Sequence, residues 1–589
     1  MAEKISGKAF DVKVFTRLMS FAKRYKLYFS IAALSTITLA LVAAANPYVL
    51  NVAINDFINT KNLTNLNYYI VLLLGLTIIE MLLQFLFIYY ANWVGQHIIR
   101  DIRAKIFRHI LEFKMSYFDN TSVGRLVTRV VSDIETIANF FTQGVFTIVS
   151  DILKMLVVIV VMFVMNWELA LIGIAVLPLL IYATKIFQIA IKATFQEVRN
   201  QVANLNGFVQ ERVTGMKIVQ LFNREKMEYK NFMEINNKHK KAHIKTVWYY
   251  SIFFPIAEIL SSIGIGLIVW YGGLQVVAGG IADVGIIIAF IKMSQMLFRP
   301  LRQIADKFNQ LQMGIVSGER VFKVMDTHSS IDKSGTLKVK NMEGNIAFKN
   351  VRFSYIQGEE ILKGISFEVK KGQTVAIVGA TGAGKSTIIN LINQLYEIDS
   401  GTIFIDTIPV NEYEILSLRK QIAVVLQDVF LFSDTIINNI TLKNEAISLG
   451  EVKVAAKKIG IHDFIMTLPG NYNYNVKERG IMLSSGQRQL IAFLRAYVNK
   501  PGILILDEAT SSVDSHAEQM IQYATDTITK DRTSIVIAHR LATIKKADKI
   551  IVMNKGLIVE EGTHNQLLRK KEGYYKNLYD KQFNVAPAS

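Results

Sequence analysis

The sequence predicts two domains of different class: an α-helical domain with six membrane spans, followed by an α/β domain. Apolar residues make up 51% of the 589-residue chain, and the mean hydropathy is +0.30. The long apolar runs all lie before about residue 300, and the remainder has the composition of a soluble domain. In this second part, a segment that fits the phosphate loop G-x-x-x-x-G-K-[ST] lies between a strand-like run and a helical run.

Six apolar runs are long enough to cross a bilayer, which takes about 20 residues in a helix. The links between runs two and three and between runs four and five are long and rich in Lys and Arg, whereas the other links are short. Because cytoplasmic loops carry an excess of Lys and Arg, we expect the long links and both termini to be cytoplasmic. The net charge of +18 is explained by Lys and Arg that flank the spans, and no motif predicts nucleic-acid binding. The runs are Leu27–Leu50, Tyr68–Val94, Phe140–Met165, Leu169–Phe187, Trp248–Tyr271 and Val276–Phe298.

These patterns divide the chain into four segments. Residues 1–26 are predicted to form a cytoplasmic elbow segment, and 27–310 the six-helix membrane domain with its cytoplasmic helices. Residues 311–343 are predicted to be a linker, and 344–589 the α/β domain. The chain has no cysteine, which excludes disulfides and thiolate metal sites.

Several charged residues lie within the predicted spans. Asp151 and Lys154 are spaced to share one face of a helix. Charges at membrane depth usually face a protein interior or a cavity. Two interpretations therefore stay open, a polar contact that lines a path through the membrane or a structural ion pair. The same alternatives apply to Glu80, Glu258, Asp283 and Lys292.

The phosphate loop runs from Gly379 to Ser386, between the apolar run Thr374–Val378 and the helical run Thr387–Leu395. Its glycines let backbone N–H groups surround phosphates, and the start of the helix favours an anion. Lys385 is expected to reach the β- and γ-phosphates, and the Ser386 hydroxyl to bind Mg²⁺. The expected nucleotide contacts are Gly379, Thr381, Gly382, Ala383, Gly384, Lys385, Ser386 and Thr387.

A second acidic motif follows the apolar run Ile503–Leu506, which ends in Asp507 and Glu508. An Asp at such a strand end holds Mg²⁺, and an adjacent Glu can polarise the attacking water. Together with the phosphate loop, this motif predicts an ATPase that uses ATP and Mg²⁺, with Lys385 and Glu508 as catalytic residues.

Further motifs make the chain resemble ATP-binding-cassette transporters over nearly its whole length. Leu483–Gln487 is similar to the family's signature Leu-Ser-Gly-Gly-Gln, with Ser485 in place of the first glycine. Ser511–Asp514 resembles the D-loop of the family. The resemblance implies nucleotide contacts by Tyr355, which would stack on adenine, and by Gln427, Ser484, Ser485, Gly486 and Gln487. It also implies a γ-phosphate contact by His539, and Mg²⁺ ligation by Ser386, Gln427 and Asp507.

The first part of the chain resembles the exporter branch of this family. The coupling segments are represented by Tyr117-Phe118-Asp119 with Gly124-Arg125-Leu126, and by Glu211, Gly215 and Phe222–Glu225. Val476–Gly480 resembles a loop specific to exporters. The resemblance implies ATP-driven export of amphiphilic small molecules, drugs or lipids by alternating access, across the cytoplasmic membrane of a bacterium. A peptide exporter and a regulatory ATP-gated channel or sensor that barely hydrolyses ATP are the alternatives.

The resemblance also implies that two cassettes bind ATP between them, each ATP lying between the phosphate loop of one chain and the signature of the other. A second copy of the chain is the favoured partner, because the other motifs are intact and two-fold dimers are the commonest assembly. Ser485 leaves a dimer with a homologous half-transporter open.

Overall fold

The computed structural model describes residues 11–61, 63–279, 283–331, 334–507, 515–538, 540–570 and 572–583. The chain divides into two compact units, one made of Met1–Leu111 and Ser122–His328, the other of Glu112–Thr121 and Ser329–Ser589. The second unit therefore includes a short segment from between the second and third spans, which the sequence analysis places in the membrane domain.

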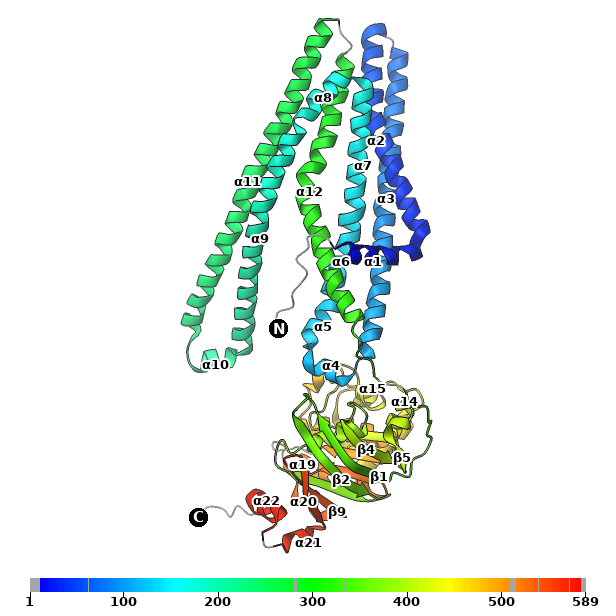
Figure 1. Cartoon of the computed structure of the whole chain (residues 1–589), viewed down its shortest axis with the longest axis vertical. Helices are drawn as coiled ribbons and strands as arrows, with labels where there is room; N and C mark the ends of the chain where they lie inside the picture. The colour runs from blue at the N-terminus through cyan, green and yellow to red at the C-terminus, as the bar shows by residue number, and fades with distance from the viewer. Residues whose placement is uncertain are drawn as a thin grey trace. The chain divides into compact units, whose positions relative to one another are not determined.

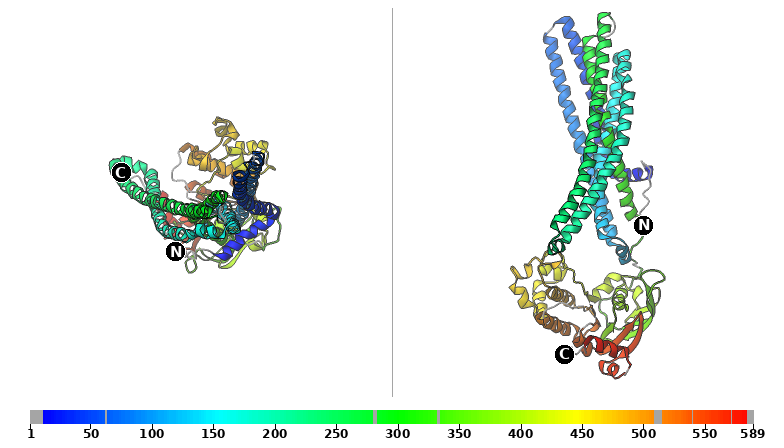
Figure 2. Two further views of the ribbon diagram at one scale, coloured as in Figure 1. Left: turned by 90° about the horizontal axis from the view of Figure 1, so that it is seen from above. Right: turned by 90° about the vertical axis from the view of Figure 1, so that its left-hand side faces the viewer.

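The first unit is entirely helical in its described residues (Figure 1). Six helical stretches in the described part of the chain are long and apolar enough to cross a membrane, which confirms the six-span prediction. Helices α9 and α11 lie side by side and are joined by the short α10 (Figure 2). The helices are α1 Val12–Ala22, α2 Lys26–Thr60, α3 Leu63–Leu111, α5 Val123–Val130, α6 Ser132–Asn139, the π-helical turn Phe140–Val145, α7 Phe146–Met165, α8 Trp167–Ala175, α9 Leu177–Thr214, α10 Met216–Leu221, α11 Glu225–Val277 and α12 Val284–Met325.

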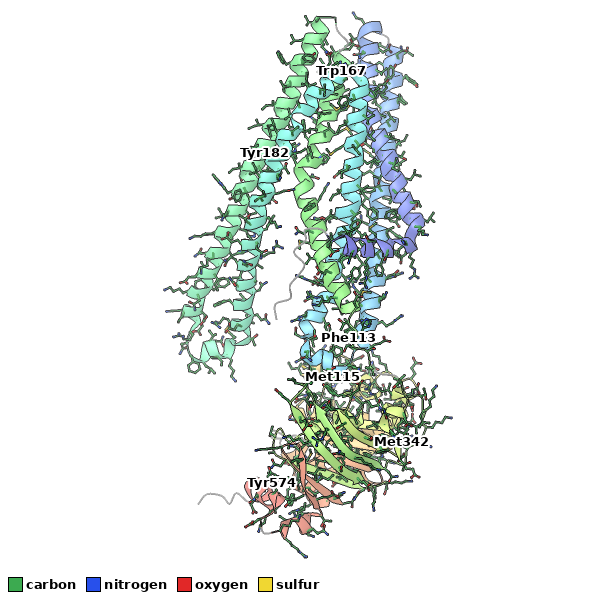
Figure 3. The ribbon with its side chains drawn as sticks, in the orientation of Figure 1. Phe113, Met115, Trp167, Tyr182, Met342 and Tyr574 are labelled. Atoms are coloured by element: carbon green, nitrogen blue, oxygen red, sulfur yellow. The ribbon has the colours of Figure 1, made fainter. Side chains whose placement is uncertain are left out.

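Local chemistry explains where two of the spans begin. Asn166 separates α7 from α8, where Trp167 begins the new helix (Figure 3), and its side-chain oxygen accepts hydrogen bonds from the first free N–H groups of α8. The predicted start of the sixth span at Val276 is wrong, because α11 continues to Val277 and α12 begins at Val284. The hydropathy of the sequence shows no break between α11 and α12, whereas the left-handed φ of +68° at Gly279 marks the turn between them. Helix α12 continues to Met325, so the first part of the expected linker is helical.

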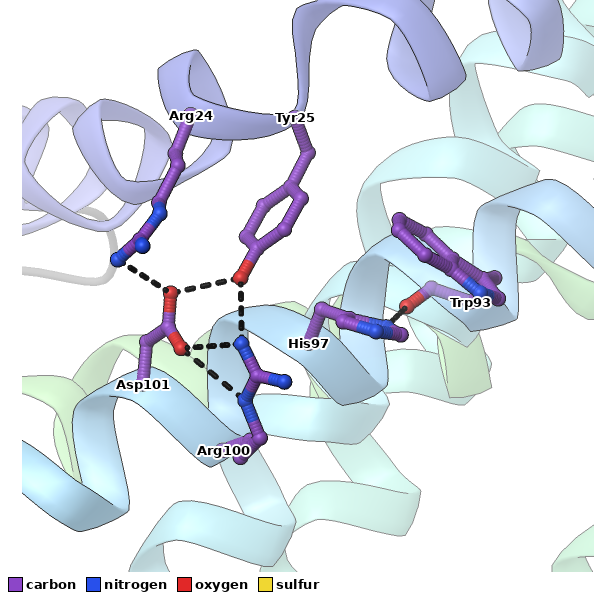
Figure 4. A network of polar contacts seen from close by, with 6 residues as sticks. All are labelled: Arg24, Tyr25, Trp93, His97, Arg100 and Asp101. Carbon is purple, nitrogen blue, oxygen red and sulfur yellow. Dashed lines mark hydrogen bonds and ion pairs between the residues drawn. The ribbon is translucent and has the colours of Figure 1, made fainter.

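A polar network joins the turn between α1 and α2 to α3 (Figure 4). The Tyr25 hydroxyl donates to Asp101 Oδ2 at 2.7 Å, and the Arg100 guanidinium donates to Asp101 Oδ1 at 3.0 Å. Arg24 contacts the same carboxylate at 3.5 Å. The ring of Tyr25 also packs edge-on against Trp93, with centroids 5.7 Å apart. One carboxylate thus holds the start of the first span against the second.

Replacement of this carboxylate is expected to destabilise the first unit. Asp101→Asn keeps the shape but removes the charge that three donors share, so we expect a loss of about 1–3 kcal/mol and a lower melting temperature in lipid nanodiscs. The matched control is Arg103→Gln, on the same helix as Asp101, which removes an exposed ion pair with Glu135 of α6 at 3.8 Å and should change little. Equal melting temperatures for the two variants would contradict a structural role of the network.

The second unit contains two sheets. The smaller is antiparallel in the order β2-β1-β4-β5, and the larger has the order β10-β9-β3-β8-β7-β6. In the larger sheet β9, β3, β8, β7 and β6 are parallel, and β10 pairs antiparallel with β9. The strands are β1 Ile346–Ser354, β2 Glu360–Val369, β3 Thr374–Gly379, β4 Ser400–Ile405, β5 Ile408–Pro409, β6 Ile422–Val425, β7 Ile503–Asp507, β8 Thr533–Ile537, β9 Lys549–Asn554 and β10 Leu557–Gly562.

Helices complete the second unit around two apolar cores that meet across the larger sheet. Strands β7 and β8 are buried along their whole length, as expected for parallel strands with both faces covered. The α-helices are α4 Met115–Asn120, α13 Lys385–Ile392, α14 Ile415–Gln421, α15 Ile436–Thr441, α16 Leu449–Ile459, α17 His462–Thr467, α18 Ser485–Val498, α19 Ser515–Thr529, α20 Leu541–Lys546, α21 His564–Leu568 and α22 Tyr574–Phe583.

Candidate functional site

The phosphate loop joins β3 to α13 at the carboxyl edge of the larger sheet, where ligands bind in open α/β folds. Two of its glycines have left-handed backbone angles, with φ of +80° at Gly382 and +96° at Gly384. A Cβ atom on Gly384 would lie 2.8 Å from the side chain of Leu362, so this position also lacks room for a larger residue. The loop therefore has the tight curvature that lets backbone N–H groups point at an anion.

Lys385 begins α13 and lies under the loop. Its side chain is nearly buried, and its Nζ donates to the carbonyl oxygens of Gly379 at 2.8 Å and Ala380 at 3.0 Å. Burial lowers the pKa of this ammonium from its ordinary value, and the negative charge of Asp507 opposes that shift. These contacts hold a single cationic group at the position where the loop could surround phosphates.

Ser386 and Asp507 lie together although 121 positions separate them in the sequence. The Ser386 hydroxyl donates to Asp507 Oδ2 at 3.1 Å, and Asp507, at the end of β7, is 6% exposed. In the described part of the chain, no cluster of three or more His, Asp or Glu side chains could hold a metal by itself. A hydroxyl beside one carboxylate does fit Mg²⁺, which keeps several water ligands and takes others from substrate phosphates.

Tyr355 follows β1 and contacts α13, the helix that the phosphate loop opens. Its hydroxyl donates to Thr387 Oγ1 at 3.3 Å and accepts from Asn390 Nδ2 at 3.0 Å, so α13 fixes the end of the side chain. The residue is 43% exposed, which leaves ring surface available for stacking.

A cavity of about 410 Å³ brings most of the predicted residues together. Its volume lies in the range of small-molecule sites. Ile361 and Ile537 were not predicted, because an isoleucine in a strand has no sequence feature that distinguishes a cavity wall from a core. The cavity is lined by Tyr355, Ile361, Thr381, Gly382, Gly384, Lys385, Ser386, Thr387, Gln427, Asp507 and Ile537.

The signature segment lies apart from this cavity within the chain. Ser484 caps α18, where its Oγ accepts from the Gln487 N–H at 3.2 Å and the Gln487 side chain accepts from the Ser484 N–H at 2.9 Å. Ser484 and Ser485 are exposed, and Gly486 is buried. None of Ser484–Gln487, all described by the structure, lines the cavity.

Three predicted features lie outside the described residues. They are Glu508, His539 and the D-loop-like segment Ser511–Asp514. The described strand β7 ends at Asp507, directly before Glu508, and β8 ends at Ile537. The roles of these residues stay predictions from the sequence.

Three of the charged residues of the spans contact side chains on other helices. Asp151 on α7 forms an ion pair with Lys307 on α12, and Glu258 on α11 forms one with Arg302 on α12. Both carboxylates are therefore ion-paired, and the partner of Asp151 is Lys307 rather than its helix neighbour Lys154. Asp283 accepts a hydrogen bond from Asn55 at 3.4 Å.

Six helices long and apolar enough to cross a membrane, together with a cavity lined by a phosphate loop, are the parts of an ATP-dependent membrane transporter. Residues 29–301 match the family model described as ABC transporter transmembrane region, and residues 362–511 match the model described as ABC transporter. YknV of Bacillus subtilis, an uncharacterized ABC transporter ATP-binding protein, is 35% identical over 591 residues, which cover 99% of this chain and 97% of that protein.

Two further relatives carry names that state an activity. YgaD of Bacillus subtilis, provisionally named a multidrug export ATP-binding/permease protein, is 35% identical, covering 96% of this chain and 99% of that protein. The ATP-dependent lipid A-core flippase of Syntrophus aciditrophicus is 32% identical, covering 97% of this chain and 94% of that protein. The chain belongs to the ABC transporter family. It is an exporter half-transporter, an ATPase coupled to transport, and needs a second half to complete the transporter.

Proposed function

We propose that two copies of this chain form an exporter that uses ATP and Mg²⁺ to move drugs or lipids across the cytoplasmic membrane of a bacterium. The cavity that joins the phosphate loop, Tyr355 and the Ser386–Asp507 pair is the observation that supports the ATPase site. The names of the multidrug and lipid A-core relatives support amphiphilic substrates. The bacterial sources of these relatives support the cytoplasmic membrane.

Each residue of the site has a distinct task in this proposal. Tyr355 stacks on the base, and the loop N–H groups with Lys385 bind the phosphates. Ser386, Gln427 and Asp507 hold Mg²⁺, which when bound neutralises phosphate charge. Glu508 orients and deprotonates the attacking water, and His539 donates towards the γ-phosphate.

The exposed start of α18 suggests how two chains together form each ATP site. The start of the helix and its dipole favour an anion, yet within one chain Ser484–Gln487 do not line the cavity. In the proposed dimer, Ser484–Gln487 of each copy face the phosphates bound by the other copy. ATP binding then favours the closed dimer, and hydrolysis removes that preference, which drives alternating access of the membrane helices.

The first test compares the wild-type chain with Glu508→Gln, both purified alone in lipid nanodiscs. We expect Mg²⁺-dependent ATP hydrolysis by a particle with the mass of two chains, and a loss of about 10²-fold or more in the variant, which should still bind ATP. Near-normal turnover in the variant would contradict the role of Glu508. An inactive wild-type monomer would contradict the homodimer and indicate a different partner half.

A further inference from the structure

The segment that holds α4 is attached by its backbone to the stretch that leads into the cassette. The Lys114 N–H donates to the Ser329 carbonyl at 2.6 Å, and the Ile331 N–H donates to the Glu112 carbonyl at 2.9 Å, on either side of an antiparallel bridge between Phe113 and Ser330. Phe113 is 3% exposed, and Figure 3 labels it together with Met115, the first residue of α4. The start of α4 is therefore tied to the chain that leads into the cassette.

Two side-chain contacts hold α4 to the cassette. The Tyr396 hydroxyl donates to Asp119 Oδ2 at 2.5 Å, and Lys114 Nζ lies 2.6 Å from Glu397 Oε1. A cavity of about 540 Å³ opens beside these contacts, so close packing does not fill this junction. Its lining includes Phe113, Lys114, Met115, Leu391, Gln394 and Tyr396. The polar contacts, rather than a filled apolar interface, set where the end of α4 lies.

Tyr396 also contacts the wall of the nucleotide cavity. Its ring meets Tyr355 edge-on, with centroids 5.0 Å apart and planes at 90°. The buried Phe353 packs against the same ring at 5.8 Å and 68°. Edge-to-face pairs of this kind are directional, so the plane of Tyr355 constrains the orientation of Tyr396. A single aromatic ring therefore separates the nucleotide cavity from Asp119 on α4.

We infer that Tyr396 and Asp119 are positioning residues that make the placement of α4 depend on the base of the bound nucleotide, and not on its phosphates alone. The inference rests on the proposed stacking role of Tyr355. Stacking of a base fixes the plane of Tyr355, the edge-on contact passes that constraint to Tyr396, and the hydroxyl of Tyr396 holds Asp119. The phosphate loop lines the same cavity as Tyr355.

The chemistry of the pair suits this role at physiological pH. Burial, reinforced by the hydrogen bond to Asp119, raises the pKa of Tyr396 above its ordinary value, so its hydroxyl remains a donor. A hydrogen bond to a carboxylate is also shorter and stronger than one between neutral groups.

Hydrogen exchange of the full chain in lipid nanodiscs tests the inference. The two probes are a non-hydrolysable ATP analogue and tripolyphosphate, which lacks the base, and each is added with Mg²⁺. Their concentrations are chosen so that both slow hydrogen exchange in peptide 379–387 to the same extent. In the wild type we expect residues 112–121 to be protected more by the ATP analogue than by tripolyphosphate. Tyr396→Phe keeps the ring but loses the hydroxyl, so the difference between the two probes should disappear at 112–121 while the protection of 379–387 remains.

Two further variants separate positioning from a loss of folding. Asp119→Ala should behave as Tyr396→Phe does, and the double variant should be no worse than either, because both act through one bond. Lys114→Gln breaks the neighbouring exposed ion pair and should keep the base-dependent difference.

Each remaining outcome has a definite meaning. Equal protection of 112–121 by the two probes in the wild type, or an unchanged difference in Tyr396→Phe, overturns the inference and leaves the proposed ATPase intact. Failure of the ATP analogue to protect 379–387 overturns the proposed nucleotide site and the inference together.

Discussion

Lys385→Met is expected to reduce ATP hydrolysis by about 10²–10³-fold, the loss that follows removal of one preorganised donor from a charged transition state. The only side-chain cation that lines the described cavity is Lys385, and its bonds to the Gly379 and Ala380 carbonyls hold it under the loop. Methionine has a similar length and no charge, so it removes the attraction for phosphate without emptying the space. The measurement is the Mg²⁺-dependent ATPase rate of the purified chain in lipid nanodiscs.

The same variant should not unfold the cassette. Burial already disfavours the charged form of Lys385 and lowers its pKa, so an apolar side chain avoids that desolvation cost. We therefore expect an unchanged or higher melting temperature together with the lost activity. The control is Lys371→Met, which changes an exposed lysine before β3 and should keep the wild-type rate. A fall in both activity and melting temperature for Lys385→Met would mean that Lys385 acts mainly as a structural residue.

The residues that the sequence could place are those whose function depends on local geometry. The phosphate loop is contiguous, and its glycine spacing indicates both the turn and the helix that follows. The capping box at the start of α18 also joins nearby residues, Ser484 and Gln487, but it was not predicted from the sequence. In the membrane unit, the length and hydropathy of the runs were sufficient to predict six spans.

The contacts that the sequence could not supply join residues that are far apart in the chain. Asp151 has a lysine on its own helix face, yet its partner is Lys307, 156 positions away. Tyr396 and Asp119 are separated by 277 positions, and the resemblance of Tyr117-Phe118-Asp119 to a coupling segment does not indicate which cassette residue Asp119 contacts. Local periodicity carries no information about which helices pack together, so such pairs emerge only from the folded structure.

Ser485→Asp is expected to reduce ATP hydrolysis by about 10²-fold or more without destabilising the cassette. Ser485 is the exposed first residue of α18, where a carboxylate interacts favourably with the helix dipole and can stabilise the helix by about 0.3–1 kcal/mol. In the proposed dimer the same carboxylate faces a phosphate. Two like unit charges about 4 Å apart repel by about 4 kcal/mol at an effective dielectric constant of about 20. The measurement is the ATPase rate and the melting temperature of one sample. We expect the rate to fall and the melting temperature to rise or stay unchanged.

The matched control is Ser485→Gly, which restores the glycine of the family signature and should keep the ATPase rate. Glycine adds no charge, and Ser484, not Ser485, supplies the capping oxygen of α18. Strong loss of activity in Ser485→Gly would show that the hydroxyl of Ser485 is itself required. A wild-type rate in Ser485→Asp would contradict a phosphate contact at this helix.

Mixed dimers show whether each site is shared between two chains. The mixed dimer combines one Lys385→Met chain with one Ser485→Asp chain and is isolated through two different tags. If the sites are shared, one site contains both substitutions and the other site contains neither. We expect this mixed dimer to recover up to about half of the wild-type ATPase rate, since one of the two symmetric sites is intact. If each site instead lay within a single chain, each site would carry one of the two changes and no activity would return. Recovery therefore requires that Ser485 of one copy act on the phosphates bound at Lys385 of the other, which is the arrangement that makes ATP a bridge between the two halves.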